Sequence, residues 1–496
     1  MNIDWVSRAR ALSPKVRNFV SGRWQPSGGQ VMGKVGPRDG QLLCQFGAGE
    51  TREVDDAVAN ARAAFDDGRW SKIAPQRRKE ALLRLAALME AHHEELALLE
   101  TLDVGKPISE PLTFDVPAAV AYIRFSAEAC DKLHGKVYGT DATSLSYEVR
   151  RPLGVVAGIV GWNFPLYLAS MKIGPVLATG NSLILKPSEL TSFSAARVAE
   201  LAMEADIPEG VLNVIHGDSA LGSALARHRG VNLVTFTGSS LTGKKLLIAA
   251  GESNMKRLVL ECGDKAPHIV FDDSPDLEAV ADTIVARAFW NQGEVCSASS
   301  RLLIQESIKE RLLDLVIRRT AALRPGDPLQ AATRFGALVS EKHQRRVLAY
   351  IEDGLRAGAR LVFQSDSQPP VAGGFYVAPT IFDQVSPEQK IGQEEIFGPV
   401  LSVMSFRDEV EAIQLANSTQ YGLTAIVWTT DLGRAHRLTQ AIDAGYIVVN
   451  ATPKPAGGTG IGVLSIGGHK ESGIGVEGGL EGLEQYLRKT TVQVCV

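Results

Sequence analysis

From residue 155 onward, short apolar segments alternate with longer segments of helical character, and this alternation constrains the fold more than any other feature of the sequence. Strands that are apolar on both faces and separated by helices are typical of parallel sheets covered on both sides. The predicted strands form two groups: 155–160, 182–186, 212–216, 233–236 and 257–260, then 268–271, 302–305, 400–406, 425–429 and 446–450. We therefore expect an α/β protein with two parallel-sheet domains.

The chain length also indicates several domains. At 496 residues the chain is too long for a single hydrophobic core, and two or three domains are expected. Before residue 155, the sequence predicts short strands within 19–48 and helices near Thr51 and Pro75. The C-terminal segment 489–496 has the pattern of a strand, which needs a sheet edge with which to pair.

Composition and charge exclude several classes of partner. The net charge is −4 without a basic cluster, which gives no reason to expect nucleic acid or an anionic membrane surface. No segment approaches the roughly 20 apolar residues of a membrane span, and the polar N-terminus lacks a signal-peptide core. The five cysteines are few, odd in number and without zinc-site spacing, so we expect a cytoplasmic protein with no metal.

One cysteine, Cys296, stands in a polar segment of small residues, 289–301, between a predicted helix (277–290) and a predicted strand (301–305). A loop between two rigid elements holds a nucleophile in place while leaving it accessible. The alternative is that Cys296 is a small buried hydrophobic residue, as most free cysteines are.

Polar side chains also follow several of the first group of strands. Asn163 follows 155–160, where its amide could stabilise an oxyanion or form a turn before Pro165. Glu261 ends 257–260 and could be a general base or a surface carboxylate.

Two further segments of this kind could bind a dinucleotide. Lys186 and Glu189 could hold ribose hydroxyls or form an exposed ion pair. The segment 237–239 precedes a predicted helix near Leu241, where it could bind a pyrophosphate or only cap the helix.

Seven short motifs follow one another between residues 162 and 473. They are Trp-Asn-Phe-Pro (162–165), Lys-Pro-Ser-Glu (186–189), Phe-Thr-Gly-Ser (236–239), Leu-Glu-x-Gly (260–263), Asn-Gln-Gly-x-x-Cys (291–296), Glu-Glu-Ile-Phe-Gly-Pro (394–399) and Gly-Gly-x-Lys-x-Ser-Gly (467–473). By these motifs and their order the chain resembles the hydrolytic, non-CoA-acylating members of the aldehyde dehydrogenase superfamily, and the resemblance covers nearly the whole chain.

The resemblance implies oxidation of an aldehyde to a carboxylic acid through a covalent intermediate. Cys296 attacks as a thiolate, and the Asn163 amide with the Cys296 backbone N–H holds the resulting alkoxide. After hydride transfer to the nicotinamide, Glu261 activates the water that hydrolyses the thioester. Lys172 matches a family lysine placed near the catalytic asparagine.

The resemblance also implies an NAD site. Lys186 and Glu189 hold the adenosine ribose, Ser239 contacts the pyrophosphate, and Glu395 holds the nicotinamide ribose. A carboxylate at position 189 repels a 2′-phosphate, so NAD is favoured over NADP. The implied cofactor site is completed by Trp162, Ser188, Phe236, Thr237, Gly238 and Phe397.

By family position, an apolar substrate tunnel is lined by Phe114, Ala118, Phe164, Leu168, Met171, Trp290 and Val295. For each of these residues the alternative is simple core packing. The implied tunnel also includes Asp115 and Glu294, which would favour a cationic aminoaldehyde if they point into it. Hydrophobic or aromatic aldehydes and ω-aminoaldehydes are therefore equal expectations.

The sequence departs from the family pattern at four places. Asp264 stands at the second position of a usual Gly-Gly pair, Glu294 stands where many members have glutamine, and Ser299 replaces a common glycine. The loop 451–466 is longer than expected and lacks an aromatic residue that often closes the tunnel. These departures leave the catalytic groups in place and bear on the substrate.

The resemblance implies three domains and a homodimer or homotetramer. The expected units are an NAD-binding domain (1–124 and 150–260), which is Rossmann-like and doubly wound, a doubly wound catalytic domain (261–465), and a small β oligomerisation flap (125–149 and 466–496). The terminal strand is expected to pair with a neighbouring subunit. Two alternatives are a non-catalytic NAD-binding structural protein and a CoA-acylating semialdehyde dehydrogenase, whose family members usually lack the equivalent of Glu261.

Overall fold

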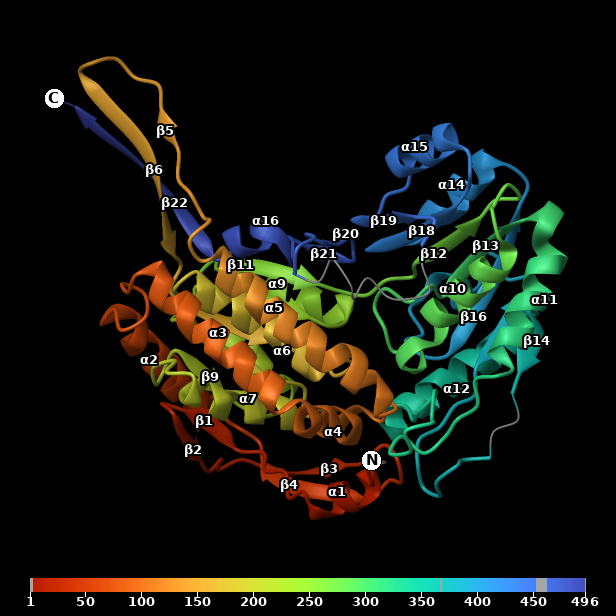
Figure 1. Cartoon of the computed structure of the whole chain (residues 1–496), viewed down its shortest axis with the longest axis horizontal. Coiled ribbons are helices and arrows are strands. Elements are labelled where there is room, and N and C mark those ends of the chain that lie inside the picture. Colours follow the sequence, from red (N-terminus) through yellow and green to blue (C-terminus); the bar gives the residue numbers. More distant parts are fainter. Residues whose placement is uncertain (1–2, 366–367, 452–461, 496) are drawn as a thin grey trace.

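The computed structural model describes residues 3–365, 368–451 and 462–495. Figure 1 shows two α/β lobes side by side and an extended β arm that projects from the first lobe. Both groups of predicted strands are present, so the predicted fold of two parallel sheets is confirmed. Part of the 451–466 loop, residues 452–461, lies outside the described residues.

The first lobe is built on an eight-stranded sheet in the order β2-β1-β9-β8-β7-β10-β11-β21. The five strands from β9 to β11 are parallel. At the two sides of this group β1 and β21 pair antiparallel with it, and β2 pairs antiparallel with β1. The strands are β1 (Asn18–Val20), β2 (Arg23–Gln25), β7 (Val155–Ile159), β8 (Ser182–Lys186), β9 (Leu212–Val214), β10 (Leu233–Thr237), β11 (Arg257–Glu261) and β21 (Gly473–Ile474). The chain runs outward from β7 to β9 and then returns to β10 beside β7, so the strand order reverses between β7 and β10. Ligands of doubly wound sheets bind at such a reversal.

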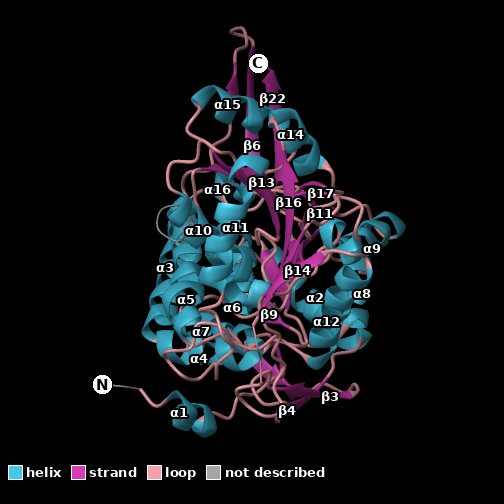
Figure 2. Cartoon of the chain, turned by 90° about the vertical axis from the view of Figure 1, so that its right-hand side faces the viewer, coloured by secondary structure: helices cyan, strands magenta, loops and turns pink. Residues whose placement is uncertain are grey.

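Helices cover both faces of this sheet (Figures 1 and 2). The helices α3 (Pro75–Ala91), α5 (Val116–Ala129), α6 (Pro165–Ala178) and α7 (Phe193–Glu204) bury their apolar faces in one core, and α2 (Thr51–Asp66), α8 (Ser219–Arg227) and α9 (Ser240–Glu252) bury theirs in another. In α2 the buried positions are Val54, Ala57, Val58, Ala61 and Ala64, which follow the 3.6-residue period of a helix. Small side chains on this stripe let α2 pack closely on the sheet.

The second lobe contains a seven-stranded sheet in the order β14-β15-β16-β13-β12-β18-β19, which is parallel except for β14. The strands are β12 (Pro267–Val270), β13 (Arg301–Gln305), β14 (Arg360–Gln364), β15 (Thr380–Asp383), β16 (Val400–Phe406), β18 (Thr424–Trp428) and β19 (Tyr446–Val449). One core contains residues of α10 (Leu277–Phe289) and α11 (Lys309–Thr320), and the other contains residues of α12 (Glu341–Arg356), α14 (Glu409–Asn417) and α15 (Leu432–Ala441). This lobe is therefore also covered on both faces.

Smaller elements complete the chain: α1 (Trp5–Ala11), β3 (Val31–Val35), β4 (Leu42–Gly47), α4 (His93–Val104), a π-helical turn (Pro111–Asp115), two 3₁₀ turns (Trp290–Gly293 and Glu306–Ile308), α13 (Lys390–Gln393), β17 (Tyr421–Gly422), β20 (His469–Lys470) and α16 (Gly479–Glu484). No helix in the described part of the chain is long and apolar enough to cross a membrane.

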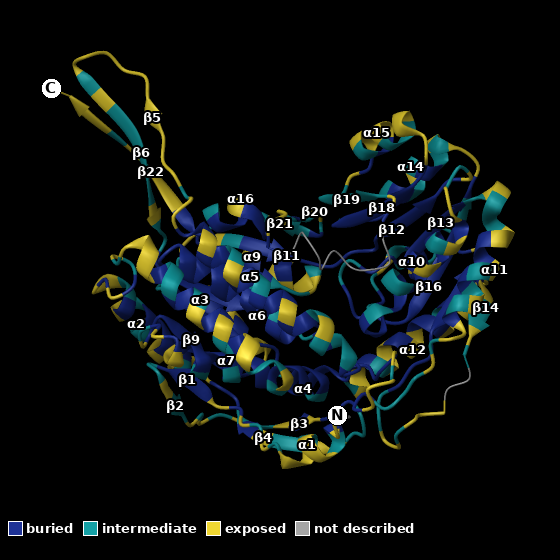
Figure 3. Ribbon diagram, viewed as in Figure 1, coloured by how far each residue is buried: buried dark blue, intermediate teal, exposed yellow. Residues whose placement is uncertain are grey.

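The arm is a three-stranded sheet of β5 (Val137–Tyr138), β6 (Ser144–Pro152) and β22 (Leu487–Cys495), in the order β22-β6-β5. The terminal strand pairs with β6 of its own chain over its full length. The terminal strand therefore has a sheet edge within its own chain. Pairing with a neighbouring subunit stays a prediction, since the other edge of β22 meets no strand among the described residues of the single chain. Much of the arm is exposed in the single chain (Figure 3).

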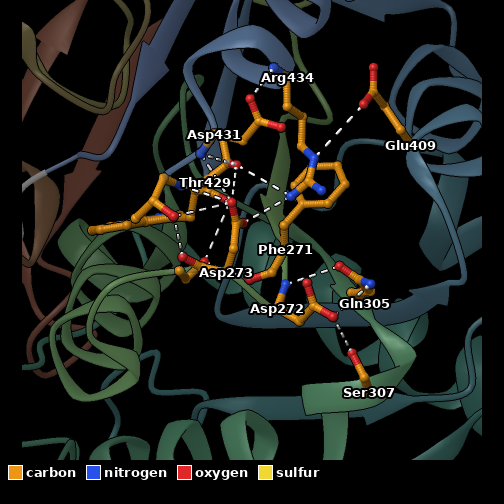
Figure 4. A network of polar contacts seen from close by, with 12 residues as sticks. Phe271, Asp272, Asp273, Gln305, Ser307, Glu409, Thr429, Asp431 and Arg434 are labelled. Atoms are coloured by element: carbon orange, nitrogen blue, oxygen red, sulfur yellow. Dashed lines mark hydrogen bonds and ion pairs between the residues drawn. The ribbon is translucent and has the colours of Figure 1, made fainter.

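A polar network joins the carboxyl ends of β12 and β18 to α15 (Figure 4). Asp273 accepts hydrogen bonds from the Thr429 hydroxyl (2.8 Å) and the Asp431 N–H (3.0 Å). It also binds the Arg434 guanidinium (2.9 Å), which lies 4.4 Å from the Phe271 ring centroid. These contacts lower the pKa of Asp273 against the opposing effect of its partial burial, so the ionised carboxylate ties the two strands to the helix.

Candidate active site

The strand-order reversal of the first sheet opens into a cavity of about 330 Å³ that both lobes line. Asn163 comes from the turn after β7, Glu261 ends β11, and Cys296 comes from the loop before β13. All three side chains line this cavity. The structure therefore brings together the three residues that the sequence predicts as nucleophile, oxyanion donor and general base.

The Cys296 loop leaves α10 through an unusual backbone. Asn291 (φ 46°), Gln292 (φ 57°) and Gly293 (φ 73°) are all left-handed, a conformation that is sparsely populated by residues other than glycine. A Cβ atom at Gly293 would lie 2.4 Å from the Gly398 carbonyl oxygen, so glycine is required there. This turn directs the half-buried Cys296 toward the cavity.

Burial, with nearby Glu395, Glu261 and Asp264, raises the pKa of the Cys296 thiol to about 12. The thiol is therefore neutral near pH 7 in the absence of ligand. Attack by sulfur then requires a group that removes the proton.

The side chain of Asn163 is fixed against the same loop. Its Nδ2 donates to the Glu294 carbonyl (2.9 Å), and the residue is only 7% exposed. A primary amide carries two N–H donors, so one remains for a ligand.

Lys172 on α6, which the resemblance places near Asn163, lies close enough to Glu261 for its charge to act on that carboxyl, but outside the cavity wall. Its ammonium forms an ion pair with Glu477 and donates to the Thr237 hydroxyl (2.8 Å). Burial raises the pKa of Glu261 well above its ordinary value, and the negative charge of Glu477 adds to this effect while Lys172 opposes it. The sequence reasoning missed Glu477, since it lies in a glycine-rich segment outside every motif.

Several of the predicted cofactor residues share the cavity, namely Trp162, Thr237, Gly238, Ser239, Glu395 and Phe397. Glu395 accepts a hydrogen bond from the Asp264 N–H (3.0 Å), and burial raises its pKa to about 7. Phe397 is left-handed (φ 60°), its carbonyl accepts from His343 Nε2 (2.6 Å), and its ring meets that of Trp162 edge-on.

Four predicted cofactor residues lie outside the cavity wall. Lys186 and Glu189 form an ion pair (3.6 Å) beyond the end of β8, and Glu189 is partly exposed. Ser188 accepts from the Leu190 N–H (3.2 Å), and Phe236 is buried within β10. On the cavity wall, Ser239 Oγ accepts from the Thr242 N–H (3.3 Å), so the helix-cap alternative is also observed.

The predicted tunnel is only partly as expected. Six of its residues line the cavity: Phe114, Phe164, Leu168, Met171, Trp290 and Val295. Rings gather around Trp290, whose centroid lies 4.6 Å from that of Phe114 and 5.0 Å from that of Phe164. Tyr167, Arg287, Tyr446, Val448, Leu464 and Ile466 also line the cavity and were not predicted.

Three predicted tunnel residues point elsewhere. Asp115 is fully buried in an ion pair with Lys106 (2.5 Å), because a buried carboxylate needs a cationic partner. Glu294 is also fully buried and accepts from the Val339 N–H (3.1 Å). Ala118 is a fully buried residue of α5. None of the three lines the cavity.

The departure at Asp264 has a local explanation. Asp264 does not have a positive φ angle, so its side chain adds no backbone strain. Its carboxylate accepts from the Thr424 N–H (2.8 Å) and the Leu423 N–H (3.3 Å), which anchors the start of β18. At the preceding Gly263, a Cβ atom would lie 2.6 Å from the Glu395 carboxylate, so only the first glycine of the pair is required. Ser299, another of the departures, is buried.

Comparison with known proteins identifies the family. The family model described as "Aldehyde dehydrogenase family" matches residues 24–492. The chain is 44% identical to the NADP/NAD-dependent aldehyde dehydrogenase PuuC of Escherichia coli K12 over 494 residues, which are 99% of this chain and 98% of the relative. It is also 44% identical to the aminoacetaldehyde dehydrogenase of Pseudomonas aeruginosa over 95% of this chain and 94% of the relative.

A solved structure has the same fold. The crystal structure of an indole-3-acetaldehyde dehydrogenase with bound NAD+ superposes with a TM-score of 0.96 at 46% identity and covers 99% of both chains. The chain therefore belongs to the aldehyde dehydrogenase family. The predicted enzyme class, an aldehyde dehydrogenase that uses NAD, is confirmed.

Proposed function

We propose that the enzyme oxidises aromatic and other hydrophobic aldehydes to carboxylic acids with NAD, through a covalent intermediate on Cys296. The observation that carries this proposal is one cavity that is lined by Cys296, Asn163 and Glu261 and by a cluster of aromatic rings. The substrate is thereby held with its carbonyl beside the nucleophile.

The residues of the strand-order reversal fit NAD. The thirteen-residue helix α9 begins there, and its N-terminal N–H groups with Thr237, Gly238 and Ser239 suit a pyrophosphate. Glu395 supplies a carboxylate for ribose hydroxyls at the cavity end. Trp162 and Phe397 give flat apolar walls. Phe236 is buried in β10 and Ser188 is buried just after β8, so neither lines the cavity.

Glu189 favours NAD over NADP. Its carboxylate, beyond the end of β8, accepts a hydrogen bond from a ribose 2′-hydroxyl and repels a 2′-phosphate. Lys186, paired with it, holds the carboxylate in place.

Side chains and backbone groups of the protein activate the nucleophile and stabilise the adduct. Glu261 takes the proton of the Cys296 thiol, and its raised pKa makes it a stronger base than an ordinary carboxylate. Sulfur adds to the aldehyde carbon, and the alkoxide accepts hydrogen bonds from the second Asn163 N–H and from the Cys296 backbone N–H. NAD, when bound, supplies the acceptor for the hydride that this adduct loses.

The resulting thioester is hydrolysed by water. Glu261, once it has released its proton, removes a proton from the attacking water, and the Cys296 thiolate leaves. The role of Lys172 is to set the charge of Glu261 together with Glu477.

The cavity favours an apolar substrate over a cationic one. The expectation of an ω-aminoaldehyde depended on Asp115 and Glu294, and both are paired away from the cavity. The aromatic wall of Phe114, Phe164 and Trp290 suits an aryl or long alkyl group. Among the relatives, one is named for indole-3-acetaldehyde and another for aminoacetaldehyde, so both substrate classes belong in the test.

We further propose a homodimer or homotetramer in the cytoplasm. Leu241 and Ile248 on α9 are 66% and 56% exposed in the single chain, and Val137 on the arm is 75% exposed. Apolar surfaces of this kind are covered in oligomers. The proposed domains are an NAD-binding domain (1–124 and 150–260), a catalytic domain (261–465) and an oligomerisation segment (125–149 and 466–496). All five cysteines are free, as suits a reducing compartment.

A substrate panel tests the proposal. NADH formation is measured with benzaldehydes, indole-3-acetaldehyde, medium-chain alkanals and aminobutyraldehyde, each with and without CoA. We expect the highest kcat/KM with the aromatic aldehydes, free acid as product, and no activity in Cys296→Ala. An enzyme that binds NAD but oxidises none of these aldehydes would contradict the catalytic proposal, and acyl-CoA formation would contradict the role of Glu261.

A further inference from the structure

Asn291 connects the two segments that carry the proposed catalytic groups. Its side chain is fully buried, and its Nδ2 lies 3.0 Å from the Asn163 carbonyl oxygen and 3.2 Å from the Glu294 carbonyl oxygen. The first carbonyl belongs to the turn after β7, and the second lies two residues before Cys296. One amide group therefore binds both segments.

The Glu294 carbonyl also accepts the hydrogen bond from Asn163 Nδ2 (2.9 Å). Because an amide group is planar, fixing one N–H of Asn163 also fixes the direction of the other. The free N–H is the one proposed to bind the alkoxide. Its direction relative to Cys296 thus depends on the position of the Glu294 carbonyl, which Asn291 holds.

A second buried donor supports this arrangement from the other side. The ammonium of Lys106 donates to the Asn163 carbonyl (2.9 Å) and lies 3.9 Å from the centroid of the Phe164 ring. Its charge is balanced by Asp115. The Asn163 peptide is thus held by two donors, of which only Asn291 also reaches the Cys296 loop.

The backbone at Asn291 is consistent with a fixed position. Asn291 and Gln292 are left-handed, which costs free energy and persists only where surrounding contacts compensate. The Gln292 side chain accepts from the Gly336 N–H (2.9 Å). Local strain of this kind is found where a catalytic loop must adopt one conformation.

We propose that Asn291 is a positioning residue that sets the free N–H of the Asn163 side chain toward the oxygen of the adduct on Cys296. The inference rests on the proposed function. It predicts that Asn291 acts on the rate through Asn163, and that it matters little once the Asn163 amide is gone.

The test is a double-mutant cycle with Asn291→Gly and Asn163→Ala. Glycine adopts the left-handed backbone of position 291 without strain, so Asn291→Gly removes the amide and spares the turn. We expect Asn291→Gly to lower kcat about tenfold to a hundredfold with KM for NAD nearly unchanged, since a misplaced catalytic group has an effect of this size. In the Asn163→Ala background the same substitution lowers kcat by less than about twofold.

Asn181→Gly is the matched control. Asn181 is as buried as Asn291, and its amide also has two acceptors, Thr179 Oγ1 (2.8 Å) and the Tyr486 carbonyl (3.0 Å). It lies at the amino end of β8, away from the cavity. We expect it to lower the thermal midpoint with kcat per folded enzyme unchanged.

The outcomes separate the two proposals. Equal losses from Asn291→Gly in both backgrounds, or a loss that follows only the fraction of unfolded protein, would overturn the positioning role. An unchanged kcat in Asn291→Gly would do the same. A wild-type enzyme without aldehyde oxidation would instead overturn the proposed function.

Discussion

The ammonium of Lys172 lies between the carboxylate of Glu477, with which it forms an ion pair, and the hydroxyl of Thr237 at 2.8 Å. The two opposite charges act on Glu261 in opposite directions. Burial raises the pKa of the proposed general base, and a pair of residues from distant parts of the sequence adjusts it further.

Glu477→Gln is expected to shift the pH profile to lower pH. The substitution removes a negative charge that raises the pKa of Glu261 and leaves Lys172, which lowers that pKa. Because the base must be ionised to act, the acid limb of kcat moves down by roughly one pH unit. The profile is measured at saturating NAD, with Glu471→Gln as a control because Glu471 pairs with Lys244 at the surface (2.8 Å). An acid limb that stays in place or moves up would contradict the charge coupling.

Thiol alkylation reports the state of Cys296 in the free enzyme. Its pKa of about 12 implies that the rate of iodoacetamide labelling rises about tenfold per pH unit between pH 7 and 9. Glu395→Gln removes a neighbouring negative charge, lowers the thiol pKa and speeds labelling at pH 8. Peptide mapping by mass spectrometry separates Cys296 from the other four cysteines. A labelling rate that levels off below pH 8 would show that the free thiol is already ionised.

The sequence predicts the scaffold well and the side-chain directions less well. Strands such as Arg301–Gln305 can be predicted because a short run of apolar residues is visible in the local sequence. The catalytic residues follow from motifs placed at strand ends. The sequence predicts Asp115 and Glu294 in the tunnel because sequence position does not reveal their partners. The ion pair with Lys106 and the hydrogen bond from the Val339 N–H hold these two carboxyl groups in the protein interior, away from the cavity.

Long-range pairing is the other part that the sequence does not specify. The strand Leu487–Cys495 finds its edge on β6, more than three hundred residues earlier. Glu477 reaches Lys172 over a similar separation. No local pattern encodes either contact, so both required the three-dimensional structure.

Trp290→Ala is expected to change substrate preference. Trp290 packs edge-on against Phe114 and tilted against Phe164 on the cavity wall. Its loss lowers kcat/KM for aromatic aldehydes about tenfold, since a ring contact and its buried area are removed, and lowers kcat/KM for propanal about twofold or less. Trp24→Ala, in β2 at the sheet edge, serves as the control. Equal losses for both substrates would indicate a general effect on the loop.

Glu189→Gln tests cofactor choice. The neutral amide still accepts a hydrogen bond from a ribose hydroxyl but no longer repels a 2′-phosphate. The ratio of kcat/KM for NAD to that for NADP falls by roughly tenfold. Glu204→Gln is the control, because Glu204 is a surface carboxylate near Arg197 (3.4 Å) on the same lobe. An unchanged ratio would show that Glu189 does not meet the 2′ position.

Asp273→Asn is expected to destabilise the second lobe in a pH-dependent way. The carboxylate accepts from Thr429 and Asp431 and pairs with Arg434 (Figure 4), and the substitution places N–H groups against these donors. Loss of the network lowers the free energy of unfolding by about 1–3 kcal/mol at pH 7.

The sign of the pH dependence follows from the lowered pKa of Asp273. A depressed carboxyl pKa stabilises the fold above the unfolded value of about 3.9 and loses this effect as pH falls through the folded value. The difference between wild type and Asp273→Asn, measured as the shift of the urea midpoint, therefore narrows below about pH 4. Asp272→Asn is the control, since its contacts with Gln305 and Ser307 (both 3.0 Å) are exposed, and a shift of about 0.5 kcal/mol or less is expected there. A difference that stays constant down to pH 3.5 would show that the ionised carboxylate is not what stabilises the network.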